Sequence, residues 1–437
     1  MYCARLETVT AAAHNLDAAL DFARGQDERD PLRALRGRFA LPRAADGSEL
    51  IYLCGHSLGP APVAARALID AEVLDWERLG VLGHEQARSP WIGYAEQLQA
   101  PLARLCGASP EEVVAMNSLS VNLHLLLASF YRPSDSRRAV LIEAGAFSSD
   151  RHVVAAQVAW HGLDPALELI ELAPCPGQEW LQIEDIEQRI AALGSRLALV
   201  LWPGVQYRTG QAFDLRRIAG AAHAAGARAG FDLAHAIGNM PLSLHDDAAD
   251  FAAWCSYKYL NAGPGAIGGA FIHQRHLADD TLPRLAGWWG HDAATRFRME
   301  PRFEPAAGAA GWAVSNPPVF STAALRASLP LFDLAGMPAL RAKSIALTRW
   351  LEQQLQERCA GDIEIITPSD PAQRGCQLSL RVRAAGQGRA LFDALGRAGV
   401  VGDWREPDVI RLAPAPLYNS FLDVLHAAVR LGEILRG

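Results

Sequence analysis

The chain has 437 residues, of which 50% are hydrophobic and 20% are charged, and its formal net charge is -7 at pH 7. This composition is typical of a globular protein and excludes a disordered chain. The length favours two or three domains. A net negative charge does not attract nucleic acid or an anionic membrane, so we expect neither partner.

The seven cysteines are widely scattered and include no C-x-x-C pair. Their odd number and spacing argue against a disulfide scaffold and against a zinc site, and they suit a reducing compartment. The N-terminal segment has no sustained apolar stretch of the signal-peptide type, and no apolar run reaches the roughly 18 residues that a membrane span requires. We therefore expect a cytoplasmic protein.

The first part of the chain has the pattern of a lead-in. A helical pattern covers residues 11–23, a polar and arginine-rich connection follows, and residues 51–54 form a strand candidate. Gly and Pro residues then mark a loop over 55–60. Helical spacing of apolar residues predicts helices over 64–79 and 94–106.

A candidate anion site follows. The pattern predicts a strand over residues 113–116 and an apolar helix over residues 119–131. Asn117 and Ser118, between them, supply capping side chains. A strand, a small polar turn and a helix N-terminus together present free backbone amides to an anion. The segment therefore has the outline of a phosphate cradle, and a plain capped helix is the alternative interpretation.

From about residue 139 onwards, short apolar runs alternate with helical patterns. The predicted strands cover 139–142, 167–172, 197–202, 227–231, 251–255 and 269–272, and predicted helices begin near residues 149, 183 and 215. Such alternation is the signature of a mostly parallel sheet covered by helices on both faces. The sequence therefore predicts an α/β fold.

Past about Ser321 the character changes to an α+β tail. Its predicted elements are helices over 322–332 and 338–358, strands over 363–366, 376–382 and 409–412, and helices from about residues 387 and 420. We expect a large domain over 55–320 and a smaller domain that joins residues 1–54 to residues 321–437.

The segment around Lys258 carries the chemistry. Lys258 lies between Tyr257 and Tyr259, at the end of the strand over 251–255 and just before a glycine-rich run. Loops that follow strands are where α/β folds place reactive groups. A lysine in a desolvated site loses its proton readily and can form a Schiff base with an aldehyde. A surface lysine beside buried tyrosines is the alternative for this segment taken alone.

Asp232 closes the strand over 227–231, and Lys258 follows near the end of the next strand. A carboxylate for a pyridinium nitrogen, a lysine for a Schiff base and a helix N-terminus for a phosphate are the contacts that pyridoxal phosphate requires. The carboxylate keeps the ring nitrogen protonated, which makes the ring an electron sink. An isolated Asp at a strand end is more often a helix cap, so the prediction of a pyridoxal phosphate enzyme depends on all three features.

Five segments of the sequence resemble segments of a known family. They are residues 230–239, 254–263, 287–291, 315–318 and 411–420. In sequence and in order they closely resemble the kynureninase family, and the tryptophan and asparagine segments are not general features of pyridoxal enzymes. The resemblance implies an aspartate-aminotransferase-like fold with a seven-stranded sheet. It also implies hydrolysis of kynurenine, or of 3-hydroxykynurenine, to anthranilate or 3-hydroxyanthranilate and alanine, in tryptophan catabolism.

The resemblance also implies roles for single residues. Lys258 would hold pyridoxal phosphate and remove the Cα proton of the substrate, Asp232 would pair with the ring nitrogen, and Phe147 would stack on the ring. Tyr257 would contact the phosphate and serve as an acid/base, since a phenol beside a cationic cofactor can have a lowered pKa. The other cofactor-binding residues that the resemblance implies are Leu119, Ser120, Ser148, Ser149, Asp150, Pro203, His235, Trp288 and Asn316.

The substrate contacts are implied in the same way. Arg411 would grip the substrate α-carboxylate with its bidentate fork, and a salt-bridged strand residue is the alternative. Ser57, His84 and Asn316 would contact the aromatic end of the substrate, although an isolated His is usually structural. Trp288 and Asn316 match residues that reach the cofactor phosphate across a dimer interface, so the resemblance implies a homodimer.

Two positions depart from the family pattern. His56 occupies a position where the family usually has Asn, in the loop Gly-Asn-Ser-Leu-Gly. Pro203 replaces a residue that elsewhere offers a hydroxyl near the phosphate, and proline cannot donate a hydrogen bond. We therefore expect one phosphate contact to be lost.

Two alternatives stay open at this point. The first is a related pyridoxal enzyme, such as a cysteine desulfurase or a selenocysteine lyase. Such an enzyme needs a reactive cysteine on a mobile loop, and Cys359 and Cys376 lie outside the cofactor segments. The second is a catalytically silent cofactor-binding protein. The joint presence of Lys258, Asp232, Tyr257 and Arg411 argues against it.

Overall fold

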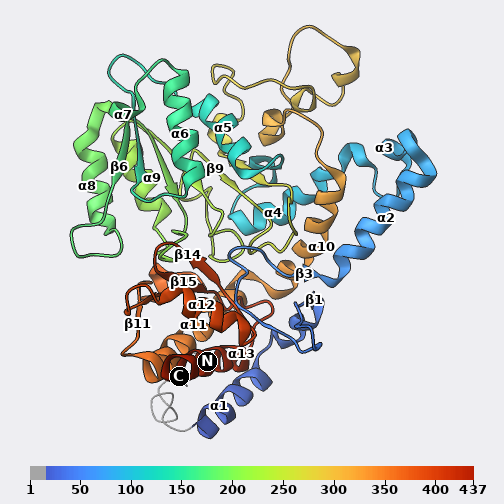
Figure 1. The fold of residues 1–437 in the computed structure, drawn as a ribbon. Coiled ribbons are helices and arrows are strands. Elements are labelled where there is room, and N and C mark those ends of the chain that lie inside the picture. The colour runs from blue at the N-terminus through green and yellow to red at the C-terminus, as the bar shows by residue number, and fades with distance from the viewer. Residues whose placement is uncertain (1–15) are drawn as a thin grey trace. The chain divides into compact units, whose positions relative to one another are not determined.

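The computed structural model describes residues 16–437 and divides into two compact units (Figure 1). The large unit consists of Ala64–Tyr207 and Ala212–Asp333. The small unit consists of the described residues up to Val63 together with Arg208–Gln211 and Leu334–Gly437.

The large unit is built on a seven-stranded sheet. In spatial order its strands are β4 (Val113–Ala115), β10 (Gly269–Ile272), β9 (Phe251–Trp254), β8 (Arg228–Asp232), β7 (Leu197–Pro203), β5 (Ala139–Glu143) and β6 (Leu169–Leu172). The strands from β9 to β6 run parallel, whereas β10 is antiparallel to both of its neighbours. The prediction of an α/β fold with a mostly parallel sheet of this size is confirmed.

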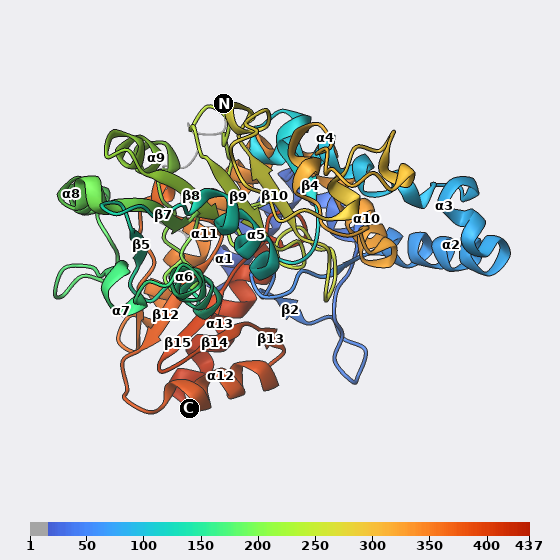
Figure 2. The same ribbon diagram turned by 90° about the horizontal axis from the view of Figure 1, so that it is seen from above.

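Helices cover both faces of this sheet. α5 (Leu119–Phe130) and α6 (Ser148–Trp160) lie on one face, and α8 (Ile183–Leu193) and α9 (Leu215–Ala224) lie on the other (Figure 2). The chain runs outward from β5 to β6 and then returns to β7 and β8, so right-handed connections place the helices on opposite faces. The carboxyl ends of β5, β7, β8 and β9 consequently meet at one edge of the sheet.

The other helices of the large unit are short, apart from the first and the last of them in chain order. They are α2 (Val63–Leu79), η3 (Gly80–Leu82), α3 (Gly83–Gln86), η4 (Trp91–Gly93), η5 (Ala95–Leu98), α4 (Gln99–Cys106), η6 (Pro110–Glu112), α7 (Pro165–Glu168), η7 (Gly194–Arg196), η8 (Gln274–His276), η9 (Trp288–Gly290), η10 (Arg296–Arg298), η11 (Gly308–Trp312) and α10 (Val319–Ala335). Residues 167–168 end α7 instead of beginning a strand, because Asp164 caps this turn and Pro165 occupies its first position.

The small unit contains a four-stranded antiparallel sheet. Its strands, in spatial order, are β11 (Ile363–Ile365), β12 (Leu378–Val382), β15 (Val409–Leu412) and β14 (Asp403–Arg405). Its other elements are α1 (Leu16–Arg29), η2 (Arg33–Arg38), β1 (Phe39–Ala40), β2 (Ile51–Tyr52), β3 (Ala61–Pro62), α11 (Met337–Cys359), η12 (Pro371–Gln373), α12 (Gly388–Arg397), β13 (Val400–Val401) and α13 (Phe421–Arg436). The first residues of the helix expected over 11–23 lie outside the described part of the chain.

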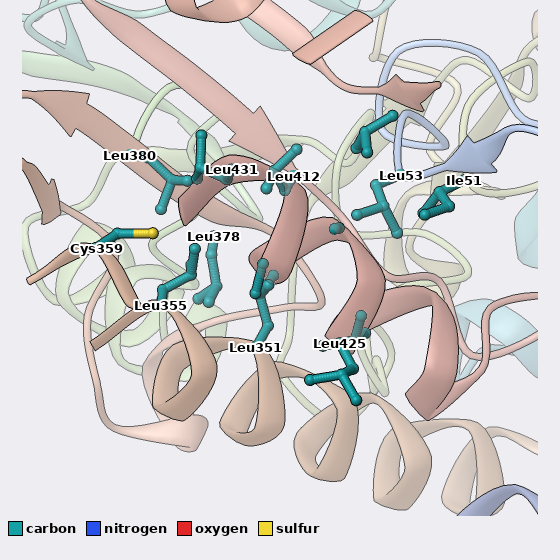
Figure 3. Close-up of a cluster of buried hydrophobic side chains, with 14 of the residues drawn as sticks. Ile51, Leu53, Leu351, Leu355, Cys359, Leu378, Leu380, Leu412, Leu425 and Leu431 are labelled. Carbon is teal, nitrogen blue, oxygen red and sulfur yellow. The ribbon is translucent and has the colours of Figure 1, made fainter. Parts of the chain in front are cut away.

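Leucines hold the small unit together. Leu378 and Leu412 from the sheet pack with Leu351 of α11 and Leu425 of α13, and all four are fully buried (Figure 3). Burying each such side chain contributes about 1.5–3 kcal/mol. Ile51 of β2 belongs to the same cluster, so the N-terminal and C-terminal segments share one core.

Candidate active site

A cavity of about 170 Å³ lies where the parallel strands of the large unit end. The residues that line it are Ser118, Leu119, Ser120, Glu143, Phe147, Ser149, Asp150, Pro203, Val205, Tyr207, Asp232, Ala234, His235, Tyr257 and Lys258. They come from the carboxyl ends of β5, β7 and β8, the N-termini of α5 and α6, and the loop after β9. Open parallel sheets bind their ligands at this edge.

Lys258 follows β9 and reaches into this cavity. Its Nζ lies 3.0 Å from His235 Nε2, and the ring centroids of Phe147 and Tyr257 lie 5.9 and 5.8 Å away. Two aromatic rings and an imidazole therefore hold the amine where it can reach a carbonyl carbon. Lys258 and Lys343 are the only lysines in the sequence, and Lys343 pairs with Asp30 at 2.7 Å in the small unit.

Asp232 is the last residue of β8, and its side chain is buried. Its Oδ1 accepts a hydrogen bond of 2.7 Å from the backbone N–H of Ala234. Burial raises the pKa of Asp232, whereas the positive charge of Lys258, this backbone hydrogen bond and a hydrogen bond from Asp150 oppose the rise. The arrangement suits a carboxylate that meets a protonated ring nitrogen.

Two more buried acids adjoin Asp232. Asp150, in the first turn of α6, hydrogen-bonds Asp232 and accepts a hydrogen bond of 3.1 Å from Ser149 Oγ. Burial and the nearby charge of Asp232 raise the pKa of Asp150 well above its usual value. Glu143 ends β5, and burial raises its pKa to about 8, with Gln206 opposing the rise and Asp232 adding to it. Sequence reasoning missed Glu143, although it closes a buried apolar strand as Asp232 does.

The other side of the cavity offers an anion site. Leu119 and Ser120 form the first turn of α5, and Ser118 precedes them as the N-cap without a side-chain cap hydrogen bond. The expectation that Ser118 caps this helix is therefore wrong, and the first backbone amides stay available to an anion. Asn122 fixes the turn instead, since its Nδ2 donates to the Met116 carbonyl at 2.9 Å.

These groups fit pyridoxal phosphate. Lys258 suits its aldehyde, Asp232 its ring nitrogen, the ring of Phe147 its ring face, and the α5 N-terminus its phosphate. Pro203 also lines the cavity and provides no donor, as the sequence indicates.

Tyr257 differs from the sequence-based expectation in its ionisation. Burial raises the pKa of Tyr257, and contact with Cys255 adds to the rise. The expected direction beside a cationic cofactor is the opposite one. Tyr207, which packs edge-on against Phe147 at 5.2 Å between centroids, is a second cavity tyrosine that sequence reasoning missed.

Four predicted residues of the large unit are not among those that line the cavity. Ser148 begins α6 with an exposed side chain, and Asn316 is exposed in the loop before α10. His84 is exposed on α3, where it packs edge-on against Trp91. Trp288 is 48% exposed.

Two predicted residues belong to the small unit. Arg411, on β15, is fully buried, and its Nη2 lies 2.8 Å from Asp403 Oδ2 on the neighbouring strand β14. The salt-bridged strand residue that the sequence left open is thus present. Ser57 donates its backbone N–H to the Cys54 carbonyl at 2.9 Å. His56 beside it, which departs from the family pattern, is fully buried.

The fold has close structural neighbours. A C-DES mutant with glycine covalently linked to its pyridoxal phosphate cofactor superimposes with a TM-score of 0.75 at 20% identity, covering 88% of this chain and 96% of its own. The cysteine desulfurase CsdA from Escherichia coli gives a TM-score of 0.73 at 18% identity, covering 93% and 98%. At these identities the likeness shows the fold, which is that of the aspartate-aminotransferase-like pyridoxal phosphate enzymes.

Sequence relatives are much closer. The family model described as the kynureninase C-terminal domain matches residues 340–431. Kynureninase from Xanthomonas campestris pv. campestris (strain B100) is 60% identical over 405 residues, which cover 92% of this chain and 95% of that protein. Kynureninase from Stenotrophomonas maltophilia (strain K279a) is 57% identical over 401 residues, covering 92% and 94%. The chain belongs to the kynureninase family.

Proposed function

We propose that the cavity around Lys258 is the active site at which this chain hydrolyses L-kynurenine, or 3-hydroxy-L-kynurenine, to L-alanine and anthranilate or 3-hydroxyanthranilate. Membership of the family makes the chain a pyridoxal-phosphate-dependent hydrolase that cleaves a carbon–carbon bond. The observation that supports the location is the convergence of Lys258, Asp232 and the N-terminus of α5 on one cavity.

The residues around the cofactor have separate tasks. Bound pyridoxal phosphate supplies an electron sink for the charge that develops at the substrate Cα. Lys258 holds the cofactor and takes the Cα proton, and His235 orients the lysine through their 3.0 Å contact. Asp232 anchors the ring nitrogen, and Phe147 covers one ring face. Water adds to the γ-carbonyl carbon of the substrate, and the Cβ–Cγ bond then breaks to release anthranilate or 3-hydroxyanthranilate. Tyr257 carries the proton transfers of these later steps, the last of which gives L-alanine.

Arg411 binds the substrate carboxylate. Two contacts with Asp403, from Nε at 3.2 Å and from Nη2 at 2.8 Å, fix the plane of its guanidinium group. Ser57, His84 and Asn316 contact the aromatic end of the substrate.

We also infer a homodimer in which Trp288 and Asn316 complete the site of the partner subunit. Both side chains are exposed in the large unit. Trp288 packs edge-on against Phe297, itself 67% exposed, so the two rings form an exposed apolar patch. Exposed apolar patches of this kind mark interaction surfaces.

We infer that the protein works in the cytoplasm. The described cysteines are free thiols, as suits a reducing compartment. None of the helices within residues 16–437 is both long and apolar enough to cross a membrane.

The desulfurase alternative is not favoured. The relatives at 57–60% identity are kynureninases, whereas the likeness to a desulfurase rests on the fold. Cys359 and Cys376 are buried, and no cysteine of the described residues lines the cavity. A reactive cysteine poised over the cofactor is therefore not supported.

The test combines a spectrum with a product assay. Protein mixed with pyridoxal phosphate should gain the visible absorbance of the lysine-bound cofactor and should release fluorescent anthranilate from L-kynurenine. Lys258→Ala should lose both. Borohydride reduction followed by peptide mapping should find the cofactor on Lys258 and leave Lys343 unmodified, which is a decisive comparison because the chain has only these two lysines. If the cofactor bound but no anthranilate were released, L-kynurenine would be excluded as the substrate. If the reduced cofactor were found on Lys343, the proposed site would be wrong.

A further inference from the structure

Three carboxyl groups face one side of the cavity. Glu143 ends β5, Asp150 lies in the first turn of α6, and Asp232 ends β8. Their residues are only 3%, 5% and 6% exposed. Three acids from three separate elements are thus buried together at the place where the ring of the cofactor is expected.

The cavity does not balance three negative charges. The titratable groups that line it with Glu143 are Asp150, Tyr207, Asp232, His235, Tyr257 and Lys258. Lys258 is the only lysine or arginine among these lining residues. A buried anion without a partner is strongly unfavourable, and carboxylates that share a site do not all ionise. At least one of the three acids must therefore keep a proton.

Hydrogen bonds indicate which of them is the anion. Asp232 accepts from the backbone N–H of Ala234 at 2.7 Å and lies near the charge of Lys258, so both neighbours favour its carboxylate form. Asp150 hydrogen-bonds Asp232, and a bond between two carboxyl groups requires a proton on one of them. That proton belongs on Asp150, which has the anion as its neighbour.

Glu143 is placed differently from Asp232. It hydrogen-bonds the side chain of Gln206, which is a neutral amide and stabilises an anion less than a cation does. Gln206 is itself tied to the chain by a 3.3 Å bond from its Nε2 to the Gly145 carbonyl. The negative charge of Asp232 also disfavours a second anion at Glu143.

We propose that Glu143 is a positioning residue that keeps a proton in the resting enzyme, so that Asp232 is the single anion available to the ring nitrogen of the cofactor. One negative charge matches the one positive charge of a protonated ring nitrogen. Ionisation of Glu143 would place a second, unpaired anion beside that pair. The inference rests on the proposed role of Asp232, and it concerns a residue that acts through Asp232 and not on the substrate.

Infrared spectroscopy of the holoenzyme tests the protonation directly. The wild-type protein near neutral pH should show the carbonyl stretching band of protonated carboxyl groups, which lies apart from the amide bands. Glu143→Gln should lose one component of this band. Glu171→Gln, on the neighbouring strand β6 and partly exposed beside Arg151, is the matched control and should leave the band unchanged. The wild-type component should also fade as the pH rises through about 8.

Isotope labelling keeps the test independent of any variant's folding. Wild-type protein grown with carboxyl-¹³C glutamate should shift the Glu143 component, whereas carboxyl-¹³C aspartate should shift the component of Asp150. Titration of the visible cofactor absorbance should show an alkaline transition in the wild type that is absent in Glu143→Gln. A band that does not respond to glutamate labelling would overturn the proposal. These readouts do not depend on anthranilate release, so a failure of the proposed reaction would be recognised separately.

Discussion

Replacing Asp250 by asparagine should strongly destabilise the large unit. Asp250 is fully buried directly before β9. Its carboxylate lies 2.8 Å from His223 Nε2 and 2.7 Å from His276 Nε2, and it accepts from the backbone N–H of Ala229 at 2.8 Å. Arg275 adds an ion pair of 2.8 Å. Asparagine keeps the size of the side chain and removes the charge on which all these partners converge.

The magnitude follows from the burial of each partner. Removing one member of a buried ion pair costs about 3–5 kcal/mol, because the other member is left unpaired. The side chains of His223 and Arg275 are 31% and 33% exposed, so water recovers part of their solvation. We therefore expect a loss of about 3 kcal/mol in the free energy of unfolding, at the lower end of the range for buried pairs.

Urea-induced unfolding followed by tryptophan fluorescence measures this loss. The matched control is Asp135→Asn, which removes an exposed carboxylate 3.9 Å from Arg138 and should change the free energy of unfolding by less than about 0.5 kcal/mol. If Asp250→Asn unfolded at nearly the same urea concentration as the control, the reasoning about this network would be refuted.

The same variant has a defined pH dependence. Burial alone would raise the pKa of Asp250, but hydrogen bonds from His223 and His276, with that from Ala229 and the charge of Arg275, hold it well below its usual value of 3.8. A depressed pKa contributes stability that is fully present above the unfolded pKa and is lost as the pH falls. The difference between wild type and Asp250→Asn should therefore be constant near neutral pH and should shrink below about pH 4.

Two further outcomes concern catalysis and packing. Tyr257→Phe should retain the cofactor absorbance and lower kcat by about 10²–10⁴-fold, and a kcat within a few fold of wild type would exclude Tyr257 as the proton carrier. Gly230→Ala should lower the free energy of unfolding by about 1–3 kcal/mol, because the added methyl group would overlap the ring of Phe251 on the neighbouring strand. Gly220→Ala, on α9 with open space around the new methyl group, is the control and should stabilise the protein by about 0.5–1 kcal/mol.

The parallel strands were predictable because they are buried on both faces. Residues 139–142 and 197–202 are continuous apolar runs, and both form strands of the large sheet. The antiparallel insertion of β10 between β4 and β9 was not predictable, since pairing between distant segments leaves no local pattern. Strand β14, Asp403–Arg405, was missed for another reason. Its sequence is polar, and its place in the sheet depends on the pairing of Asp403 with Arg411 across the strands.

The candidate site was predictable where a reactive residue lies at the carboxyl end of a strand or shortly after it. Lys258 and Asp232 are in such positions, and the structure brings them to one cavity. Glu143 is in the same position on β5 and was missed, because a single acid at a strand end carries no chemical signature of its own. The expected cap at Ser118 is wrong because its side chain accepts no hydrogen bond from the first turn of the helix. Asn122 instead holds the turn by donating to the Met116 carbonyl.

Asp232 and Asp250 lie at opposite ends of the paired strands β8 and β9, and the same residue type serves two purposes there. Asp250 is surrounded by histidines and arginines, so its pKa falls and its charge stabilises the fold. Burial raises the pKa of Asp232 by more than Lys258, Ala234 and Asp150 lower it, so its ionised form destabilises the fold at neutral pH. Asp232→Asn should therefore leave the free energy of unfolding unchanged or increase it, while anthranilate release is lost. Urea unfolding and the product assay on one preparation would decide this, and a destabilisation as large as that of Asp250→Asn would contradict it. A stable but inactive variant would show that the charge of Asp232 is maintained for chemistry and at the expense of stability.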